Sequence, residues 1–228
     1  FPPNNQGLTA LILLNILEGI DLKSMRDDPG QYHHTLIEAT KIAFADRNRF
    51  IADPAFGKLP VTELISKEYA AKRRALINPQ KAIDPPSYGD FRTGSDTTYF
   101  TVVDKDRMAV SFINSLFNSF GSGIVAGDTG IMLHNRGTGF SVDPKHPNRY
   151  EPGKRPFHTL IPGFITKPGG ANAADGAGDE PYMSFGLMGG AMQAQGHAQF
   201  IINHLVFGMD VQAAQDAGRF RHESGLRV

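Results

Sequence analysis

The sequence predicts an α+β protein in which helices pack on largely antiparallel β-sheets. Apolar residues recur with helical spacing near both ends of the chain, whereas the middle changes to β-branched and aromatic runs with a period of two. The chain has 228 residues and is 40% hydrophobic, which suffices for a sizeable core in one domain or two closely merged lobes. The order of helices, then strands, then helices, with no regular alternation, favours this class.

Helical patterns open the chain. Residues 7–20 are apolar nearly all round, and apolar residues repeat at helical spacing from Tyr32 to about Phe50. A shorter helix fits residues 65–77. The polar, proline-rich residues 78–95 then predict an exposed loop.

Strand patterns fill the middle of the chain. Residues 97–104 and 108–116 are rich in β-branched and aromatic side chains and are separated by a turn-like DKDR, which predicts a hairpin. Glycine-rich and polar loops separate the later strand-like runs, which are residues 130–135, 159–167 and 182–187. The segment 168–180, rich in Gly, Ala and Asp, predicts a loop between paired strands.

Helical patterns return after Gly189 and Gly190. Apolar residues including Phe200 and Leu205 lie on one side of the next helix, and a further short helix is predicted with Asp210 as its N-cap.

Composition excludes several classes of function. Lysine plus arginine number 23 and aspartate plus glutamate number 23, so no field of one sign favours nucleic acid or an anionic membrane as a partner. The absence of cysteine removes disulfides and thiolate chemistry, and leaves the compartment open. The apolar run at residues 8–17 is too short to span a bilayer. Two prolines leading directly into a core helix suggest a start inside a longer chain.

Three motif matches fail on spacing. Asp104 and Asp106 begin like a calcium loop, but the glycine and glutamate that such a loop needs are missing. His33 and His34 are adjacent, so they cannot share a metal on one helix face. The run GSGIVAG has the wrong spacing for a dinucleotide site. The sequence therefore predicts neither a metal nor a nucleotide.

The stretch GSDTTYFTVVD, residues 94–104, places two threonines between a loop and a strand. If the peptide bond between Asp96 and Thr97 were cut, Thr97 would gain an α-amine that can accept the proton of its own hydroxyl. One residue would then supply both nucleophile and base. Threonine also simply favours strands, so the stretch alone leaves both interpretations open.

Longer motifs favour the interpretation of Thr97 as a nucleophile. DTTYFTVVDKDRMAV, FGSGIVAGDTGIML, PGKRPFHTLIP, GLMGGAMQAQGH and FGMDVQAAQDAGRF occur in this order, and together the sequence resembles the γ-glutamyltransferase family of N-terminal nucleophile hydrolases. The resemblance implies an αββα sandwich, made as a precursor that cuts itself into two associated subunits. Residues 1–96 resemble the end of the large subunit, and residues 97–228 resemble most of the small one.

The resemblance also implies roles for individual residues. Thr97 would attack the carbonyl of Asp96 during self-cleavage, and later the acyl group of a small-molecule amide, without metal or organic cofactor. Ser115 matches a family threonine that bonds near the nucleophile, although a strand-end serine commonly bonds locally as well. Gly189 and Gly190 match the pair whose amides form the oxyanion hole, and a tight strand-to-helix turn would use them equally.

The substrate-binding positions depart from the family. Its γ-glutamyl enzymes hold the substrate's α-amino and α-carboxylate groups with polar residues, and the corresponding residues here are Phe117, Arg136, Gly139, His158 and Thr159. Because an ammonium needs acceptors, we expect the acyl specificity to have shifted, for example toward a group with a carboxylate and no amine. Arg136 would bind this carboxylate, with His158 and Thr159 as further donors, unless it is simply a solvated loop arginine.

Gln193, His197 and His204 share a helical stripe, which we interpret as a polar seam against the sheet because a nucleophile with its own amine needs no histidine. Three functional hypotheses follow. The first is a γ-glutamyltransferase-like amidohydrolase acting on glutathione-like amides. The second is an acylase of the same fold that does not recognise γ-glutamyl groups. The third is an uncut, inactive chain that serves as a binding or assembly module.

Overall fold

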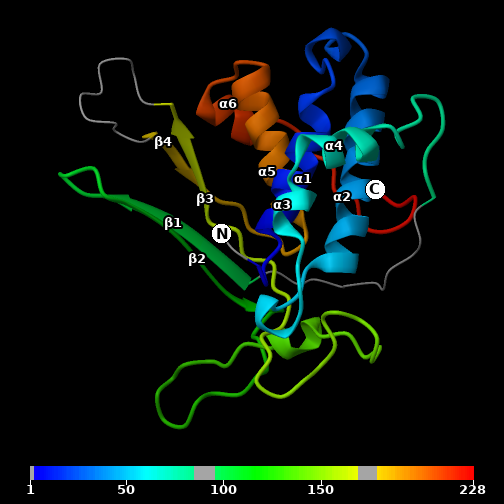
Figure 1. Cartoon of the computed structure of the whole chain (residues 1–228). Coiled ribbons are helices and arrows are strands. Elements are labelled where there is room, and N and C mark those ends of the chain that lie inside the picture. Colours follow the sequence, from blue (N-terminus) through cyan, green and yellow to red (C-terminus); the bar gives the residue numbers. More distant parts are fainter. Residues whose placement is uncertain (1–2, 85–95, 169–178) are drawn as a thin grey trace.

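The computed structural model describes residues 3–84, 96–168 and 179–228, and within strand β1 it leaves the side chain of Asp96 undescribed. The predicted exposed loop and the predicted tip therefore fall largely outside the described residues. The α+β class is confirmed, with helices gathered on one side of the molecule and two β-hairpins on the other (Figure 1). None of the helices in the described ranges is long and apolar enough to cross a membrane.

Three helices build the main core, and a fourth packs against it through the partly buried Tyr69. The three are α1 (Gly7–Glu18), α2 (Pro29–Phe50) and α5 (Met192–Ile201), and the fourth is α4 (Lys67–Arg74). The helices α1 and α2 meet through residues such as Ile12, Leu36 and Ile42, and Ala198 of α5 joins the same cluster. Residues from both ends of the chain thus share one hydrophobic core, which positions the later site.

The helix boundaries follow from capping. The α2 helix begins where the Asp28 side chain accepts a hydrogen bond from Gln31 N, with Pro29 at the first helical position. The predicted helix over residues 65–77 is shorter than expected, because Ser66 caps α4 and a separate turn, α3 (Val61–Leu64), precedes it. Beyond α5 the chain continues as a π-helix, Ile202–Val206, and then as α6 (Val211–Asp216), whose predicted cap Asp210 accepts from Ala213 N.

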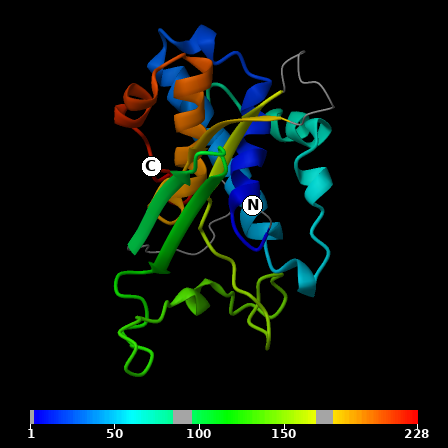
Figure 2. The same ribbon diagram turned by 90° about the vertical axis from the view of Figure 1, so that its left-hand side faces the viewer.

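The strands form two antiparallel hairpins. Strand β1 (Asp96–Val103) pairs with β2 (Ala109–Phe117), and β3 (Gly163–Lys167) pairs with β4 (Glu180–Phe185). Figure 2 shows the first hairpin in front of the helices. Thr97 lies opposite Ser115, and the register shifts between Asp96 and Thr97. The described ranges contain one helical layer, so the second outer layer of an αββα sandwich is not seen in them.

The strand predicted at residues 130–135 is wrong. In its place stands a loop with an isolated bridge between Val125 and Met132. Four glycines with positive φ turn the chain repeatedly on either side of this bridge, at positions 121, 123, 127 and 130. The hydroxyl of Ser122 donates to Leu133 O and that of Thr129 to Ala126 O, so local side-chain bonds take the place of a ladder.

Tyr99 ties the two hairpins together. Its hydroxyl lies 3.0 Å from Ser111 Oγ on β2 and 2.9 Å from Ser184 Oγ on β4. Ser111 in turn donates to Gly163 O on β3 at 3.0 Å. The Tyr99 ring covers Gly186 so closely that a Cβ atom there would lie 2.3 Å from the ring.

This contact predicts the effect of a single methyl group. We expect Gly186→Ala to destabilise the fold by about 1–3 kcal/mol, because the new methyl overpacks the ring. Gly57→Ala is the matched control, since its backbone is extended and its Cβ would touch nothing within 4 Å. Urea unfolding of both variants measures the difference, and equal stabilities would contradict the tight contact.

Candidate active site

The predicted nucleophile lies at the start of the first hairpin. Thr97 is half-buried, and its Oγ1 donates a hydrogen bond to Ser115 Oγ at 3.1 Å. Ser115 Oγ also accepts from Phe117 N at 2.9 Å. The register of the first hairpin therefore brings together the hydroxyls of Thr97 and Ser115, the two candidates from the sequence. Their catalytic roles remain predictions.

Phe117 ends strand β2 in an unusual conformation. Its φ of +82° lies in a region that favours glycine, so surrounding contacts must hold it there. Its ring is buried and lies 5.1 Å from the guanidinium carbon of Arg136. Arg136 opens a short 3₁₀ helix, Arg136–Gly139, and the preceding Asn135 is hydrogen-bonded back to the end of β2.

Arg136 is not a solvated loop residue. It is 7% exposed, its Nη1 donates to Thr159 Oγ1 at 3.5 Å, and its Nη2 has no partner among the described residues. No carboxylate in the described ranges lies within ion-pair distance of it. Burial lowers the pKa of Arg136 to about 10, so the side chain is still a cation near neutral pH. Within the described part of the chain, the site thus holds a buried positive charge without a counter-ion.

His158 and Gly139 complete the surroundings of Arg136. Burial, then the charges of Arg136 and Arg155, lower the pKa of His158 to about 4, so its imidazole is neutral near pH 7. At Gly139, a Cβ would lie 2.8 Å from Phe157 O, which leaves no room for an acidic side chain. Substrate ammonium groups therefore find no negative charge at these positions.

Gly189 and Gly190 form the turn between β4 and α5. Their φ angles are +110° and +58°, which residues with side chains rarely adopt. Met192 N donates to Gly189 O at 3.0 Å, and Gln193 N donates to Gly190 O at 3.1 Å. The positive end of α5 follows directly, which suits stabilisation of an anion. The turn is linked to the strand of Thr97 through the packing of Tyr99 on Gly186.

Sequence reasoning missed two residues around this turn. Tyr99 lies on the same face of β1 as Thr97, so the period of two could have indicated that it faces the site. Gln6 is fully buried and donates to the carbonyls of Thr159 and Gly190, which lie far from it in the sequence. A single glutamine in a polar stretch carries no signal of such contacts.

An ion pair between the buried carboxylate of Asp53 and the largely exposed Arg155 joins the two halves of the chain across the predicted cleavage position. The carboxylate of Asp53, 3% exposed, accepts hydrogen bonds from Arg155 N, Nε and Nη2 at 2.9, 3.1 and 2.7 Å. These bonds, chiefly those of the Arg155 side chain, hold the pKa of Asp53 well below its usual range. The pair therefore stabilises the fold above the ordinary pKa of aspartate, and its contribution is lost as the pH falls below that value.

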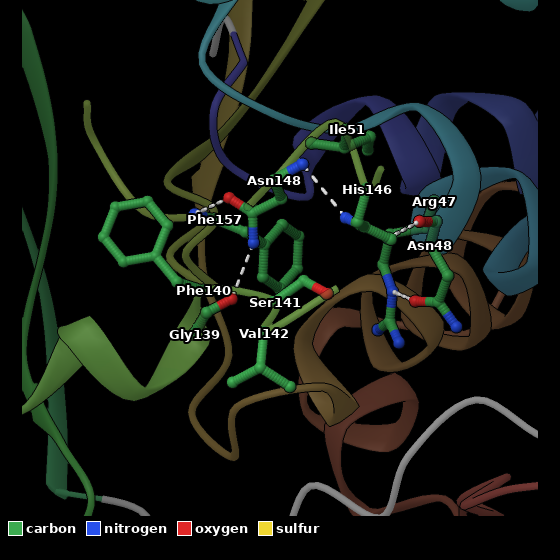
Figure 3. Close-up of a pocket in the computed structure, with 10 residues that line it drawn as sticks. All are labelled: Arg47, Asn48, Ile51, Gly139, Phe140, Ser141, Val142, His146, Asn148 and Phe157. Atoms are coloured by element: carbon green, nitrogen blue, oxygen red, sulfur yellow. Dashed lines mark hydrogen bonds between the residues drawn. The ribbon is translucent and has the colours of Figure 1, made fainter. Parts of the chain in front are cut away.

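A cavity of about 280 Å³ lies beside the Arg136–Gly139 turn (Figure 3). The polar side chains around it already have protein partners. Asn148 donates to Gly139 O and accepts from Phe157 N, and His146 lies 2.8 Å from Asn48 O. Thr97, Ser115, Gly189 and Gly190 do not line it. We therefore interpret this cavity as part of the scaffold that holds the loop after Arg136.

The predicted polar stripe runs from α5 into the π-helix that follows it, and its two histidines pack against the second hairpin. His197 lies 4.7 Å from the ring of Phe185, and His204 Nε2 lies 2.7 Å from the hydroxyl of Tyr182. Gln193 accepts a hydrogen bond from Ile161 N at 2.9 Å. The described residues contain no group of three acidic or histidine side chains that could hold a metal.

The burial of His197 predicts that the stability of the fold depends on pH. His197 is 2% exposed, its Nε2 has no partner in the described part of the chain, and burial lowers its pKa to about 4. The unfolded chain therefore binds a proton near the ordinary histidine pKa while the folded chain does not, so the free energy of unfolding decreases as the pH falls from 7 toward 4. We expect His197→Phe to reduce this decrease in urea unfolding at pH 7 and 5. Gln193→Met, a non-titrating control, should shift stability equally at both pH values.

Comparisons with known proteins agree with the motifs. The family model described as Gamma-glutamyltranspeptidase matches residues 1–227. The glutathione hydrolase-like YwrD proenzyme of Bacillus subtilis is 43% identical over 100% of this chain and 42% of its own. The oxamate amidohydrolase proenzyme of Klebsiella pneumoniae is 38% identical over 92% of this chain and 37% of its own.

A solved structure supports the fold. The cephalosporin acylase from Bacillus halodurans superposes with a TM-score of 0.84 at 43% identity, over 99% of this chain and 38% of that one. The chain thus spans about two fifths of the length of these relatives.

Proposed function

Because the chain belongs to the γ-glutamyltranspeptidase family, we propose that the protein is an N-terminal threonine amidohydrolase or acyltransferase acting on γ-glutamyl, glutathione-like amides. The observation that carries this proposal is the position of Thr97, second in strand β1, with its hydroxyl 3.1 Å from Ser115 Oγ. A nucleophile held by a strand on one side and released from a loop on the other suits self-cleavage.

Self-cleavage would begin with attack of Thr97 Oγ1 on the carbonyl carbon of Asp96. The bond between this carbon and Thr97 N breaks, an ester forms, and water hydrolyses the ester to a carboxylate on Asp96 and a free hydroxyl on Thr97. Residues 1–96 and 97–228 would then belong to two subunits. The Asp53–Arg155 pair and the shared core of α1, α2 and α5 favour their continued association.

Turnover would use the same oxygen. The α-amine of Thr97 accepts the proton as Oγ1 attacks the substrate amide, and the leaving amine takes that proton when the C–N bond breaks. Water or an acceptor amine then takes the acyl group from the ester. Ser115 would orient the nucleophile, and the amides of the Gly189–Gly190 turn would stabilise the oxyanion.

A second candidate is an acylase with a shifted acyl group, and the surroundings of Arg136 favour it. A buried cation with no counter-ion among the described residues, a neutral His158 and a glycine with no space for a carboxylate disfavour an α-ammonium. The same cation favours a carboxylate, with Thr159 as a further donor. The substrate would then be the amide of a dicarboxylic acid, such as a glutaryl amide.

One experiment tests both candidates. The full-length protein is incubated, its intact mass is measured, and kcat/KM is compared for γ-glutamyl and glutaryl p-nitroanilides. Two fragments that separate before Thr97, together with p-nitroaniline release, support the enzyme. A preference for the glutaryl compound selects the second candidate, and a preference for the γ-glutamyl compound discards it. A persistent single chain without activity would contradict both and favour an inactive binding module.

A further inference from the structure

Gln6 is a buried hub that joins three segments of the chain. It is 0% exposed and immediately precedes α1. Its Nε2 donates to Gly190 O at 2.8 Å and to Thr159 O at 3.0 Å, and its Oε1 accepts from Arg47 Nη1 at 3.2 Å. Both amide hydrogens and the amide oxygen are therefore engaged, and each partner belongs to a different part of the fold.

The bond to Gly190 O orients a peptide plane of the glycine turn. The carbonyl of Gly190 shares its plane with the amide N–H of Ala191, and the carbonyl of Gly189, held by Met192 N, shares its plane with the N–H of Gly190. Glycine itself gives little conformational restriction. The backbone bonds from Met192 N and Gln193 N hold these two carbonyls from the start of α5, and Gln6 adds a further bond to Gly190 O from a distant part of the sequence.

Arg47 holds Gln6 in turn. Its Nε donates to Asn48 Oδ1 at 3.0 Å, and its guanidinium lies 4.1 Å from the ring centre of Phe44 (Figure 3 shows the bond to Asn48). Burial lowers the pKa of Arg47 to about 10, which leaves it cationic near neutral pH. A cation at Oε1 polarises the glutamine amide, so its N–H groups become stronger donors.

We infer that Gln6 is a positioning residue for the reaction, which sets the glycine turn and the Thr159 loop at the geometry that the transition state needs. The inference rests on the proposed function, because it assigns to the turn the stabilisation of the oxyanion. It also means that residues 1–96 act on the site after cleavage. Gln6 belongs to that part, whereas Thr159 and Gly190 belong to the part that begins at Thr97.

The test is Gln6→Glu in the full-length protein. The substitution keeps shape and volume and allows an ion pair with Arg47, but it replaces the amide that donates to the two carbonyls with oxygens. We expect kcat to fall at least about tenfold, because misplaced oxyanion donors lose much of their effect. The loss should be similar for γ-glutamyl and glutaryl p-nitroanilides, since the turn serves any acyl group, and KM should change less than about threefold.

Gln195→Glu is the matched control. Gln195 is equally buried and holds both His222 N and His222 O, far from Thr97 in the sequence and with no bond to the turn. It should lower the Tm about as much as Gln6→Glu while keeping kcat. Gln6→Met and Gln195→Met repeat the comparison without a new charge.

The Thr97→Ala variant distinguishes a failure of the inference about Gln6 from a failure of the proposed function. If Thr97→Ala is inactive and Gln6→Glu has the same kcat as Gln195→Glu, the inference about Gln6 is overturned while the proposed function stands. If Thr97→Ala retains activity, the proposed function fails, and this inference fails with it. A selective loss of kcat in both Gln6 variants supports the positioning role.

Discussion

Replacing Thr97 by alanine should abolish both self-cleavage and amide hydrolysis. The variant loses the oxygen that would attack Asp96 and later the substrate, and in hydrolases with an activated hydroxyl such a loss lowers kcat by about 10⁴- to 10⁶-fold. Intact mass after incubation measures cleavage, and release of p-nitroaniline measures hydrolysis. Thr97→Ser keeps a hydroxyl and should still separate into two fragments.

Thr98→Ala is the control for this prediction. Thr98 is exposed and points to the opposite face of β1, so it shares the backbone environment of Thr97 without the contact to Ser115. It should be cleaved and should remain active. A Thr97→Ala protein that still yields two fragments, or still hydrolyses amides, would remove the basis of the proposed mechanism.

The second large effect concerns Arg136. If its guanidinium binds the carboxylate of the acyl group, Arg136→Gln should lower kcat/KM for a glutaryl amide by about 10²-fold, because a buried charge pair loses one partner. A γ-glutamyl amide should lose less, since removal of the cation also relieves repulsion of its α-ammonium. The ratio of kcat/KM for the glutaryl amide to kcat/KM for the γ-glutamyl amide does not depend on the concentration of active enzyme. This ratio therefore measures the effect of Arg136 on substrate preference.

Two controls sharpen this comparison. A valeryl amide has no carboxylate, so its kcat/KM should be nearly the same with Arg136→Gln as without it. Arg149→Gln removes another arginine of the same loop, which is partly exposed and already pairs with Glu151. It should leave all three substrates unaffected. Equal losses for the glutaryl and valeryl amides would show that Arg136 does not bind the carboxylate.

The first hairpin could be predicted from local sequence patterns. The change of period at Thr97 and the turn-like residues 104–107 predicted two strands, and pairing across that turn places Thr97 opposite Ser115. The cap at Asp210 was likewise predicted from local residues. By contrast, residues 130–135 looked like a strand, but in the described ranges they form only one isolated bridge, from Met132 to Val125, because strand pairing is a property of the fold.

Periodicity, turns and ordered motifs involve residues close along the chain, so the printed sequence was enough to predict the α+β class, the order of most elements and Thr97 as the candidate nucleophile. The burial of Arg136 without a carboxylate partner among the described residues, and the bonds from Gln6 to the carbonyls of Thr159 and Gly190, became visible only in the folded protein. Burial and long-range hydrogen bonds depend on which distant segments pack together, and one polar side chain looks the same in a sequence whether water or protein surrounds it.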